Sequence, residues 1–136
     1  MGRTGSKPMV LDSSALVAMH LEEPGYERLF QRVQAADVVL IGAPTLFESA
    51  MVLTARVGPQ VRSVLEVSIR RMGATIVPFS EDHFHAATDA FLRFGKGRHP
   101  AALNFGDCMS YAVAKVAGMP LLYVGNDFSQ TDITPA

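Results

Sequence analysis

Four short runs of apolar residues are separated by longer segments in which apolar residues recur at helical spacing. The apolar runs cover residues 9–12, 38–41, 75–78 and 121–124. A strand whose side chains are nearly all apolar is typical of a parallel sheet with helices on both faces. We therefore predict four central strands that are covered on both sides.

The segments between these runs carry the start and stop signals of helices. Pro24 suits a first helical turn, and apolar residues follow it at helical spacing through Val33. Ser80 is a typical helix N-cap with acidic residues after it, and glycines end the later segments. These helices are expected at residues 45–57, 59–72, 81–94 and 104–117. The alternation predicts an α/β fold, a three-layer α/β/α sandwich with a mainly parallel central sheet.

The length and composition indicate one folded domain. A chain of 136 residues suits a single core, and 49% hydrophobic with 18% charged residues argues against disorder. We place the domain at residues 9–134. Residues 1–8 lack the apolar segment of a signal peptide and are expected to be a flexible tail or a remnant of expression.

The charge balance and the cysteine content exclude several classes of function. The 12 Lys and Arg residues are matched by 13 Asp and Glu, so that any contact with a nucleic acid would need a local basic patch. One cysteine, Cys108, excludes an internal disulfide and a Cys-rich zinc site and favours a reducing, cytoplasmic location. No run of about 18 apolar residues is present, and we therefore expect no membrane span.

Three acidic residues stand in apolar surroundings. Asp12 ends the first strand, whereas Glu48 and Asp107 lie in otherwise apolar helices. Asp127 follows the last strand. Buried carboxylates are normally paired or bound to a metal, and ligands of open α/β sheets bind at the carboxyl ends of the strands. The four acids are therefore expected to share one crevice.

Carboxylates crowded into one crevice repel one another, and divalent cations are the ordinary remedy. A set of oxygen ligands without Cys or His selects Mg²⁺ or Mn²⁺ over zinc. Such a site can activate a water molecule and neutralise charge on a scissile phosphate. Metal-assisted hydrolysis of a phosphodiester is the chemistry that these residues favour.

Each acid also has a purely structural interpretation. Asp12 could cap a helix that begins at Ser13 or Ser14, Asp107 could cap its own helix, and Glu48 could lie on an exposed stripe. The metal hypothesis is preferred because all of these acids fall at plausible crevice positions.

The motifs in this order resemble those of PIN-domain ribonucleases, and in particular of VapC-type toxins. The resemblance rests on the Asp12 segment at 10–18, on Glu48, on the Gly-Asp-Cys triplet within 103–112, and on the strand and turn at 120–133. It extends from residue 9 to residue 133.

The resemblance implies an Mg²⁺- or Mn²⁺-dependent endoribonuclease, the toxin of a type II toxin–antitoxin pair. Such toxins are usually homodimers inhibited by a VapB-type antitoxin. By family role, Asp12 and Asp107 would be the main metal ligands and Glu48 would complete the site. Many members carry a fourth acid where this chain has Gly125, and the fourth carboxylate is therefore expected from Asp127 or, as an alternative, from Asp132.

Other residues are assigned around this core of acids. Ser14 would be a supporting hydroxyl that holds a carboxylate or a metal-bound water, with a plain helix start as the alternative. Lys96 and Arg98 lie in a Gly-rich loop before the Asp107 helix and are expected to contact the RNA backbone, unless the loop is simply solvated. Four further residues could line an antitoxin groove or belong to the core: Phe30, Phe47, Val57 and Val61.

Two rival functions remain open from the sequence. Asp12 could be the covalent nucleophile of a haloacid-dehalogenase-like phosphatase, but such enzymes carry a second Asp two residues on, where this chain has Ser14. The other rival is a PIN module that binds a partner without catalysis. Intact Asp12, Glu48 and Asp107 argue against it.

Overall fold

The computed structural model describes residues 7–136, so most of the expected N-terminal tail, residues 1–8, lies outside the described residues. The helices and strands follow one another in the order β1 (Met9–Leu11), α1 (Ser13–His20), α2 (Tyr26–Ala35), β2 (Val39–Gly42), α3 (Ala43–Val57), α4 (Val61–Arg71), β3 (Ala74–Val77), α5 (Glu81–Phe94), α6 (Phe105–Ala117) and β4 (Leu121–Leu122). The predicted strands and helices are confirmed with small shifts of their ends. None of the helices between residues 7 and 136 is long and apolar enough to cross a membrane.

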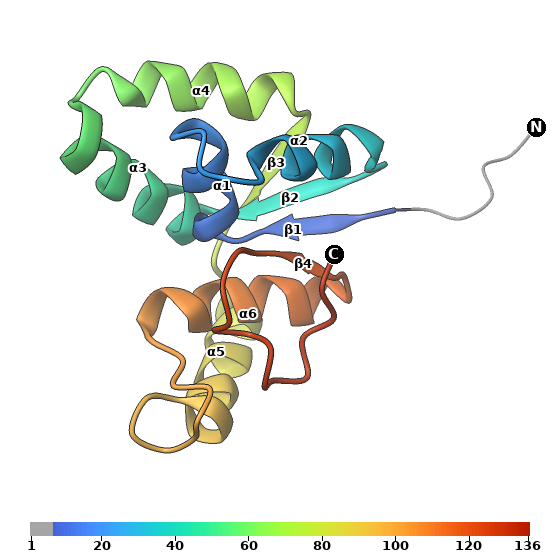
Figure 1. Cartoon of the computed structure of the whole chain (residues 1–136). Coiled ribbons are helices and arrows are strands. Elements are labelled where there is room, and N and C mark those ends of the chain that lie inside the picture. The colour runs from blue at the N-terminus through green and yellow to red at the C-terminus, as the bar shows by residue number, and fades with distance from the viewer. Residues whose placement is uncertain (1–6) are drawn as a thin grey trace, which may run out of the picture.

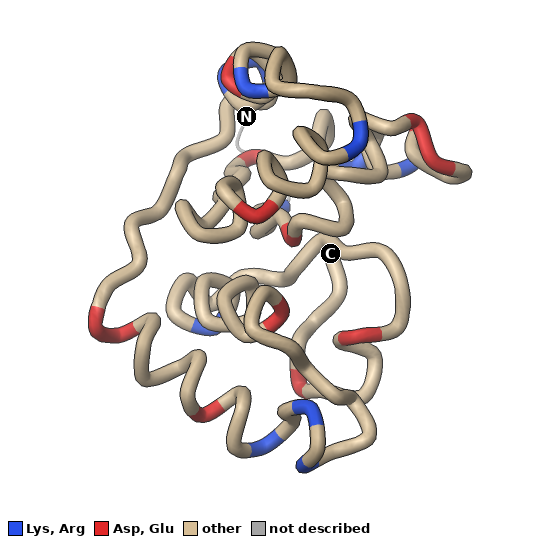
Figure 2. Tube along the Cα trace, turned by 90° about the vertical axis from the view of Figure 1, so that its left-hand side faces the viewer, with Lys and Arg blue, Asp and Glu red and all other residues tan. Residues whose placement is uncertain are grey.

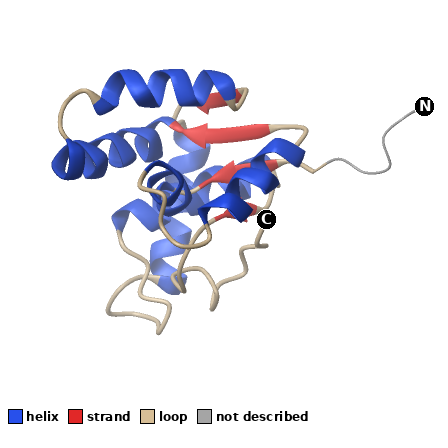
Figure 3. Ribbon diagram, turned by 45° about the horizontal axis from the view of Figure 1, so that its top comes forward, coloured by secondary structure: helices blue, strands red, loops and turns tan. Residues whose placement is uncertain are grey.

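The four strands form one parallel sheet in the order β3-β2-β1-β4. Helices α1 to α4 lie on one side of this sheet and α5 and α6 on the other (Figures 1 and 3). The predicted three-layer α/β/α sandwich is confirmed. Because β2 and β3 extend the sheet from one side of β1 and β4 joins on the other, the direction of winding changes between β1 and β4. Ligands of such sheets bind at this switch point.

Strand β1 divides two hydrophobic cores. Met9 and Leu11 pack with α1 to α4, whereas Val10 between them packs with α5 and α6. Successive side chains of a strand point to opposite faces, which explains why all three residues are buried. The chain that follows β1 is therefore anchored from both sides.

One expectation about the strands is wrong. The sequence predicts that the run at 75–78 is covered on both faces, but β3 is an edge strand in which Thr75 and Ile76 are exposed. Ile76 keeps 47% of its surface accessible. The apolar composition could not reveal this position, because strand order in a sheet is decided by pairing between distant segments. At the other edge, the C-terminal residues Thr134 and Ala136 exchange backbone hydrogen bonds with Leu121 of β4.

Candidate active site

Asp12 is the N-cap residue of α1, directly after β1 at the switch point of the sheet. Its Oδ2 accepts hydrogen bonds from the backbone N of Ser14 at 3.1 Å and from the Ser14 hydroxyl at 2.5 Å. Its Oδ1 accepts a hydrogen bond from the hydroxyl of Ser110 at 2.5 Å. With only 4% of its surface exposed, the side chain is held by donors on both oxygens. The capping role considered from the sequence is present, and it leaves the carboxylate at the end of the strand.

Ser14 connects Asp12 to the neighbouring strand. Its hydroxyl donates to Asp12 and accepts a hydrogen bond of 3.0 Å from the backbone N of Val124, just beyond β4. One hydroxyl therefore joins the ends of β1 and β4. A residue that only started a helix would not make this second contact.

Asp107 lies in the first turn of α6, where it forms a capping box with Asn104. Each backbone N of this pair donates to the other side chain, at 3.1 and 2.9 Å. Burial and, to a smaller extent, the nearby carboxylates of Asp127 and Asp12 raise the pKa of Asp107 to about 7, although the backbone hydrogen bond from Asn104 acts in the opposite direction. The ionised form of Asp107 is therefore destabilised by burial and by the two neighbouring acids.

Glu48 projects from α3 onto the first turn of α6. A Cβ added at Gly106 would come within 2.7 Å of the Glu48 carboxyl carbon, so the absence of a side chain at position 106 makes room for the carboxylate. Burial and the charge of Asp12 raise the pKa of Glu48, partly offset by a hydrogen bond from Ser13. Its Oε1 is buried without a hydrogen-bond partner. The alternative of a solvated stripe is therefore wrong for Glu48.

The two candidates for a fourth acid lie in different environments. Asp127 interacts with Asp107 through a side-chain hydrogen bond and through charge. Asp132 instead accepts hydrogen bonds from the Tyr111 hydroxyl at 2.7 Å and from the Lys115 ammonium at 3.0 Å, with Arg93 at 3.5 Å. The structure thus brings together Asp12, Glu48, Asp107 and Asp127, which we call the acid cluster, and places Asp132 in a separate ion-pair network.

The acid cluster has the donor chemistry of a hard divalent cation. Its ligand atoms are all oxygens, and the Glu48 Oε1 is an unsatisfied buried acceptor. Within residues 7–136, no three His, Cys, Asp or Glu side chains converge closely enough to enclose an ion by themselves. Mg²⁺ does not require such a cage, because it commonly binds one or two carboxylates and keeps several waters. The residues present therefore fit Mg²⁺ or Mn²⁺ with solvent completing the shell.

Lys96 and Arg98 are exposed in the loop between α5 and α6. The loop is closed by backbone hydrogen bonds from Leu103 to Phe94 and from Lys96 to Leu103, one residue before the Asn104 cap. Its base is therefore fixed to the start of α6. In Figure 2, acidic positions are found near the middle of the face where the strands end, and a group of basic positions lies below them at this loop.

Three supporting hydroxyls were missed by reasoning from the sequence. Ser110 reaches Asp12, Thr45 lies behind Ser110, and Ser13 bonds to Glu48. A helical signal was available for two of them. Ser110 follows Asp107 by three residues and Thr45 precedes Glu48 by three, so each shares a helix face with an acid.

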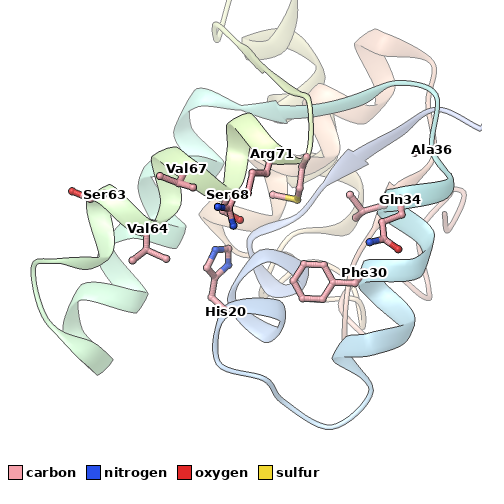
Figure 4. Close-up of a pocket in the computed structure, with 11 residues that line it drawn as sticks. His20, Phe30, Gln34, Ala36, Ser63, Val64, Val67, Ser68 and Arg71 are labelled. Carbon is pink, nitrogen blue, oxygen red and sulfur yellow. The ribbon is translucent and has the colours of Figure 1, made fainter.

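The four residues considered for an antitoxin groove do not line one surface. Phe30 borders a cavity of about 810 Å³ between α1, α2 and α4, together with His20 and Arg71 (Figure 4). Phe47 lines a different pocket of about 560 Å³ between α3, α4 and β3. Val57 is exposed and Val61 is buried in the core. None of the acids of the cluster lines either pocket.

Comparison with known proteins assigns the chain to a family. Residues 9–133 match the family model of the PIN domain. The chain is 46% identical over 126 residues to ribonuclease VapC36 of Mycobacterium tuberculosis, covering 92% of this chain and 91% of the relative. It is 42% identical over 125 residues to ribonuclease VapC of Mycolicibacterium smegmatis, covering 92% and 97%.

Solved structures show the same fold at low sequence identity. VapC20 of Mycobacterium tuberculosis, described as a Sarcin-Ricin loop cleaving toxin, superposes with a TM-score of 0.75 at 17% identity over 94% of this chain and 98% of that one. VapBC2 from Rickettsia felis, bound to a DNA fragment from its promoter, gives 0.72 at 14% identity over 93% and 95%. The family model and the relatives above 40% identity together confirm the resemblance seen in the sequence motifs: the chain belongs to the PIN-domain family, among its VapC proteins.

Proposed function

We propose that the chain is a Mg²⁺-dependent endoribonuclease, the toxin of a type II toxin–antitoxin pair, acting on RNA in the cytoplasm. The observation that carries this proposal is the convergence of Asp12, Glu48, Asp107 and Asp127 from four separate segments at the switch point of the sheet. Relatives that are 42% and 46% identical over most of the chain are named ribonucleases. Substitution of Mg²⁺ by Mn²⁺ is compatible with an all-oxygen donor set.

Each acid has a distinct role in the proposal. Asp12 and Asp107 would hold the ion, which when bound supplies an activated water and neutralises charge on the scissile phosphate. Glu48, with its unsatisfied Oε1, would orient a water molecule beside the first turn of α6. Asp127 would complete the negative cluster beside Asp107. Ser14 would keep the Asp12 carboxylate in place through its bonds to Asp12 and Val124.

RNA and an antitoxin would approach the acid cluster from solvent. Lys96 and Arg98 would contact phosphates of the RNA, since both are exposed on a loop whose base adjoins the Asp107 helix. A VapB-type antitoxin would bind with a basic or apolar segment, and the toxin would form a homodimer as its family members usually do. Similar folds occur in the VapBC2 structure and in a toxin–antitoxin complex from Klebsiella pneumoniae.

The phosphatase alternative fits the geometry less well. That class of enzyme carries a second Asp two residues after the nucleophile, and this chain has Ser14 at that position. The backbone N and the hydroxyl of Ser14 both donate to Asp12 Oδ2, so position 14 supplies a supporting hydroxyl and no second carboxylate. Trapping of a phosphoenzyme with a small phosphate ester would support that rival and contradict the nuclease.

The proposal is tested with the purified full chain and a structured RNA. We expect cleavage with Mg²⁺, loss of cleavage with a chelator, and no cleavage by the Asp12→Asn variant, with mapped RNA ends showing internal cuts. Expression with and without the neighbouring gene of its operon would test for the antitoxin, because growth arrest should be suppressed by co-expression. Cleavage that persists in Asp12→Asn would refute the metal mechanism, and binding without cleavage would favour the non-catalytic module.

A further inference from the structure

The buried carboxylate of Asp12 is contacted by a hydroxyl from a remote part of the chain. Ser110 lies 98 residues away on α6, is fully buried, and donates to Asp12 Oδ1 at 2.5 Å. The other oxygen, Oδ2, already accepts both donors of Ser14. A carboxylate offers about two acceptor positions on each oxygen, so one position is left, on the oxygen that Ser110 contacts. Ser110 therefore acts on the oxygen that remains available to a cation.

A second buried hydroxyl stands behind Ser110. Thr45 Oγ1 on α3 lies 3.3 Å from Ser110 Oγ, and Thr45 is 1% exposed. A hydroxyl has a single proton, and the Ser110 proton is directed to the Asp12 carboxylate, which only accepts when ionised. Thr45 must then be the donor to Ser110. The order Thr45 to Ser110 to Asp12 is a directed chain in which each bond polarises the next.

The hydrogen bond between Thr45 and Ser110 connects α3, which carries Glu48, to α6, which carries Asp107. Thr45 precedes Glu48 by three residues on α3, and Ser110 follows Asp107 by three residues on α6. Both hydroxyls thus lie one helical turn from an acid of the cluster. Any shift of α3 against α6 would be transmitted to the orientation of the Asp12 carboxylate.

Ser49 shows that a buried serine at this interface need not reach across to another helix. It is also fully buried on α3, but its hydroxyl donates to the carbonyl of Thr45 in its own helix at 2.9 Å. Serine hydroxyls in helices often make this local bond. Ser110 is directed to Asp12 instead, and Ser49 provides a matched control in which the same group is buried without contacting the acid.

We propose that Ser110 is a positioning residue, which with Thr45 behind it holds the Asp12 carboxylate in place for the divalent cation. The inference rests on the proposed metal-dependent function. Partners of ligating carboxylates outside the metal shell commonly affect metal affinity by 10–100-fold. Ser110 is expected to act on metal affinity without touching RNA.

The test measures binding of Mn²⁺ to the full chain by calorimetry in the absence of RNA. We expect Ser110→Ala to raise the dissociation constant about tenfold. Thr45→Val, which removes the hydroxyl at nearly constant volume, should raise it by less, because Ser110 can still donate. Ser110→Thr keeps a hydroxyl and should restore most of the affinity. Ser49→Ala should leave the constant within about twofold of the wild type, because the Ser49 hydroxyl bonds within its own helix and does not contact Asp12.

Two further measurements separate positioning from structure. Circular dichroism and the melting temperature without metal are measured for all variants. Ser110→Ala and Ser49→Ala each lose one buried hydroxyl, and these measurements report the effect of that loss on the fold. RNA cleavage followed against Mg²⁺ concentration should show a higher half-saturating concentration for Ser110→Ala and recovery of most of the rate at saturation. Equal Mn²⁺ affinities in Ser110→Ala and wild type would overturn the inference and leave the nuclease proposal intact. A wild-type chain that binds no Mn²⁺ would overturn both.

Discussion

Asp107 lies on α6 and Asp132 bonds to two side chains of the same helix, yet one carboxylate has acidic neighbours and the other has hydrogen-bond donors and cations around it. Asp107 is buried beside Asp127 and Asp12, and its pKa is raised by burial and by those charges. Partial burial also acts on Asp132, but hydrogen bonds from Tyr111 and Lys115 outweigh it and lower its pKa. Ionisation of Asp107 destabilises the fold, whereas the charge of Asp132 stabilises it. The comparison separates a carboxylate whose neighbours are acidic from one whose neighbours are hydrogen-bond donors and a lysine.

Replacement of Asp107 or Asp132 by Asn should have opposite effects on the stability of the metal-free protein. Asp107→Asn keeps the acceptor that caps α6 but removes a carboxylate that we propose as a metal ligand, and we expect RNA cleavage to fall by at least about 100-fold. The same change relieves repulsion from Asp12 and Asp127 and should raise the metal-free melting temperature. Initial cleavage rates and calorimetric melting measure both effects. An active Asp107→Asn variant would contradict the assignment.

The pH dependence of stability should distinguish the two regions. The folded-state pKa of Asp107, about 7, lies above its ordinary value of 3.8, so its contribution is present at low pH and is lost as the pH rises through about 7. Asp132 acts in the opposite direction, and its contribution is lost as the pH falls through its lowered pKa. With a chelator present, the melting temperature of the wild type should therefore fall relative to Asp107→Asn between about pH 4 and pH 7.

Addition of Mg²⁺ should reverse this trend. In the proposed site the ion would bind the ionised carboxylates, so the increase in melting temperature on addition of Mg²⁺ should grow as the pH rises. Parallel pH profiles for wild type and Asp107→Asn, with and without Mg²⁺, would argue against a strained acid cluster.

Asp132→Asn is expected to lower the free energy of unfolding by about 1 kcal/mol, because the pair with Lys115 is partly exposed and screened by solvent. RNA cleavage at saturating Mg²⁺ should stay within about twofold of the wild type. Asp132 accepts hydrogen bonds from Tyr111 and Lys115, outside the acid cluster, and substitutions at sites without shared contacts rarely affect one another. Urea unfolding and cleavage assays measure the two quantities. A large loss of cleavage without loss of stability would place Asp132 in the site after all.

The smallest effect is expected from the basic loop. The double variant Lys96→Ala/Arg98→Ala should weaken RNA binding several-fold and, because two phosphate contacts are lost, reduce the salt dependence of binding by about 1.5 units of slope. Its unfolding free energy should change by less than about 0.5 kcal/mol, because both side chains are exposed. Arg56→Ala, in the last turn of α3, is the matched control for loss of a surface charge. Equal salt slopes in all three proteins would exclude the loop from RNA binding.

The elements and three of the acids could be predicted because their signals are local. Apolar periodicity and the Ser80 cap placed the helices, and Asp12, Glu48 and Asp107 stood out because their neighbours in sequence are apolar. The covering of 75–78 was predicted wrongly for the same reason. Local composition reports that a strand is apolar but not that β3 stands at the edge of the sheet.

Local sequence therefore determined the fold class, the family motifs and the acids that lack solvent around them. The packing of distant segments is what places Asp127 beside Asp107, pairs Asp132 with Lys115 and brings Ser110 to Asp12. Helix and strand preferences act over a few residues, whereas the charge state and orientation of a buried carboxylate depend on donors and charges within a few ångströms in space. Those neighbours come from segments as much as 98 residues apart, and their positions exist only after the sheet has brought β1, α3 and α6 together.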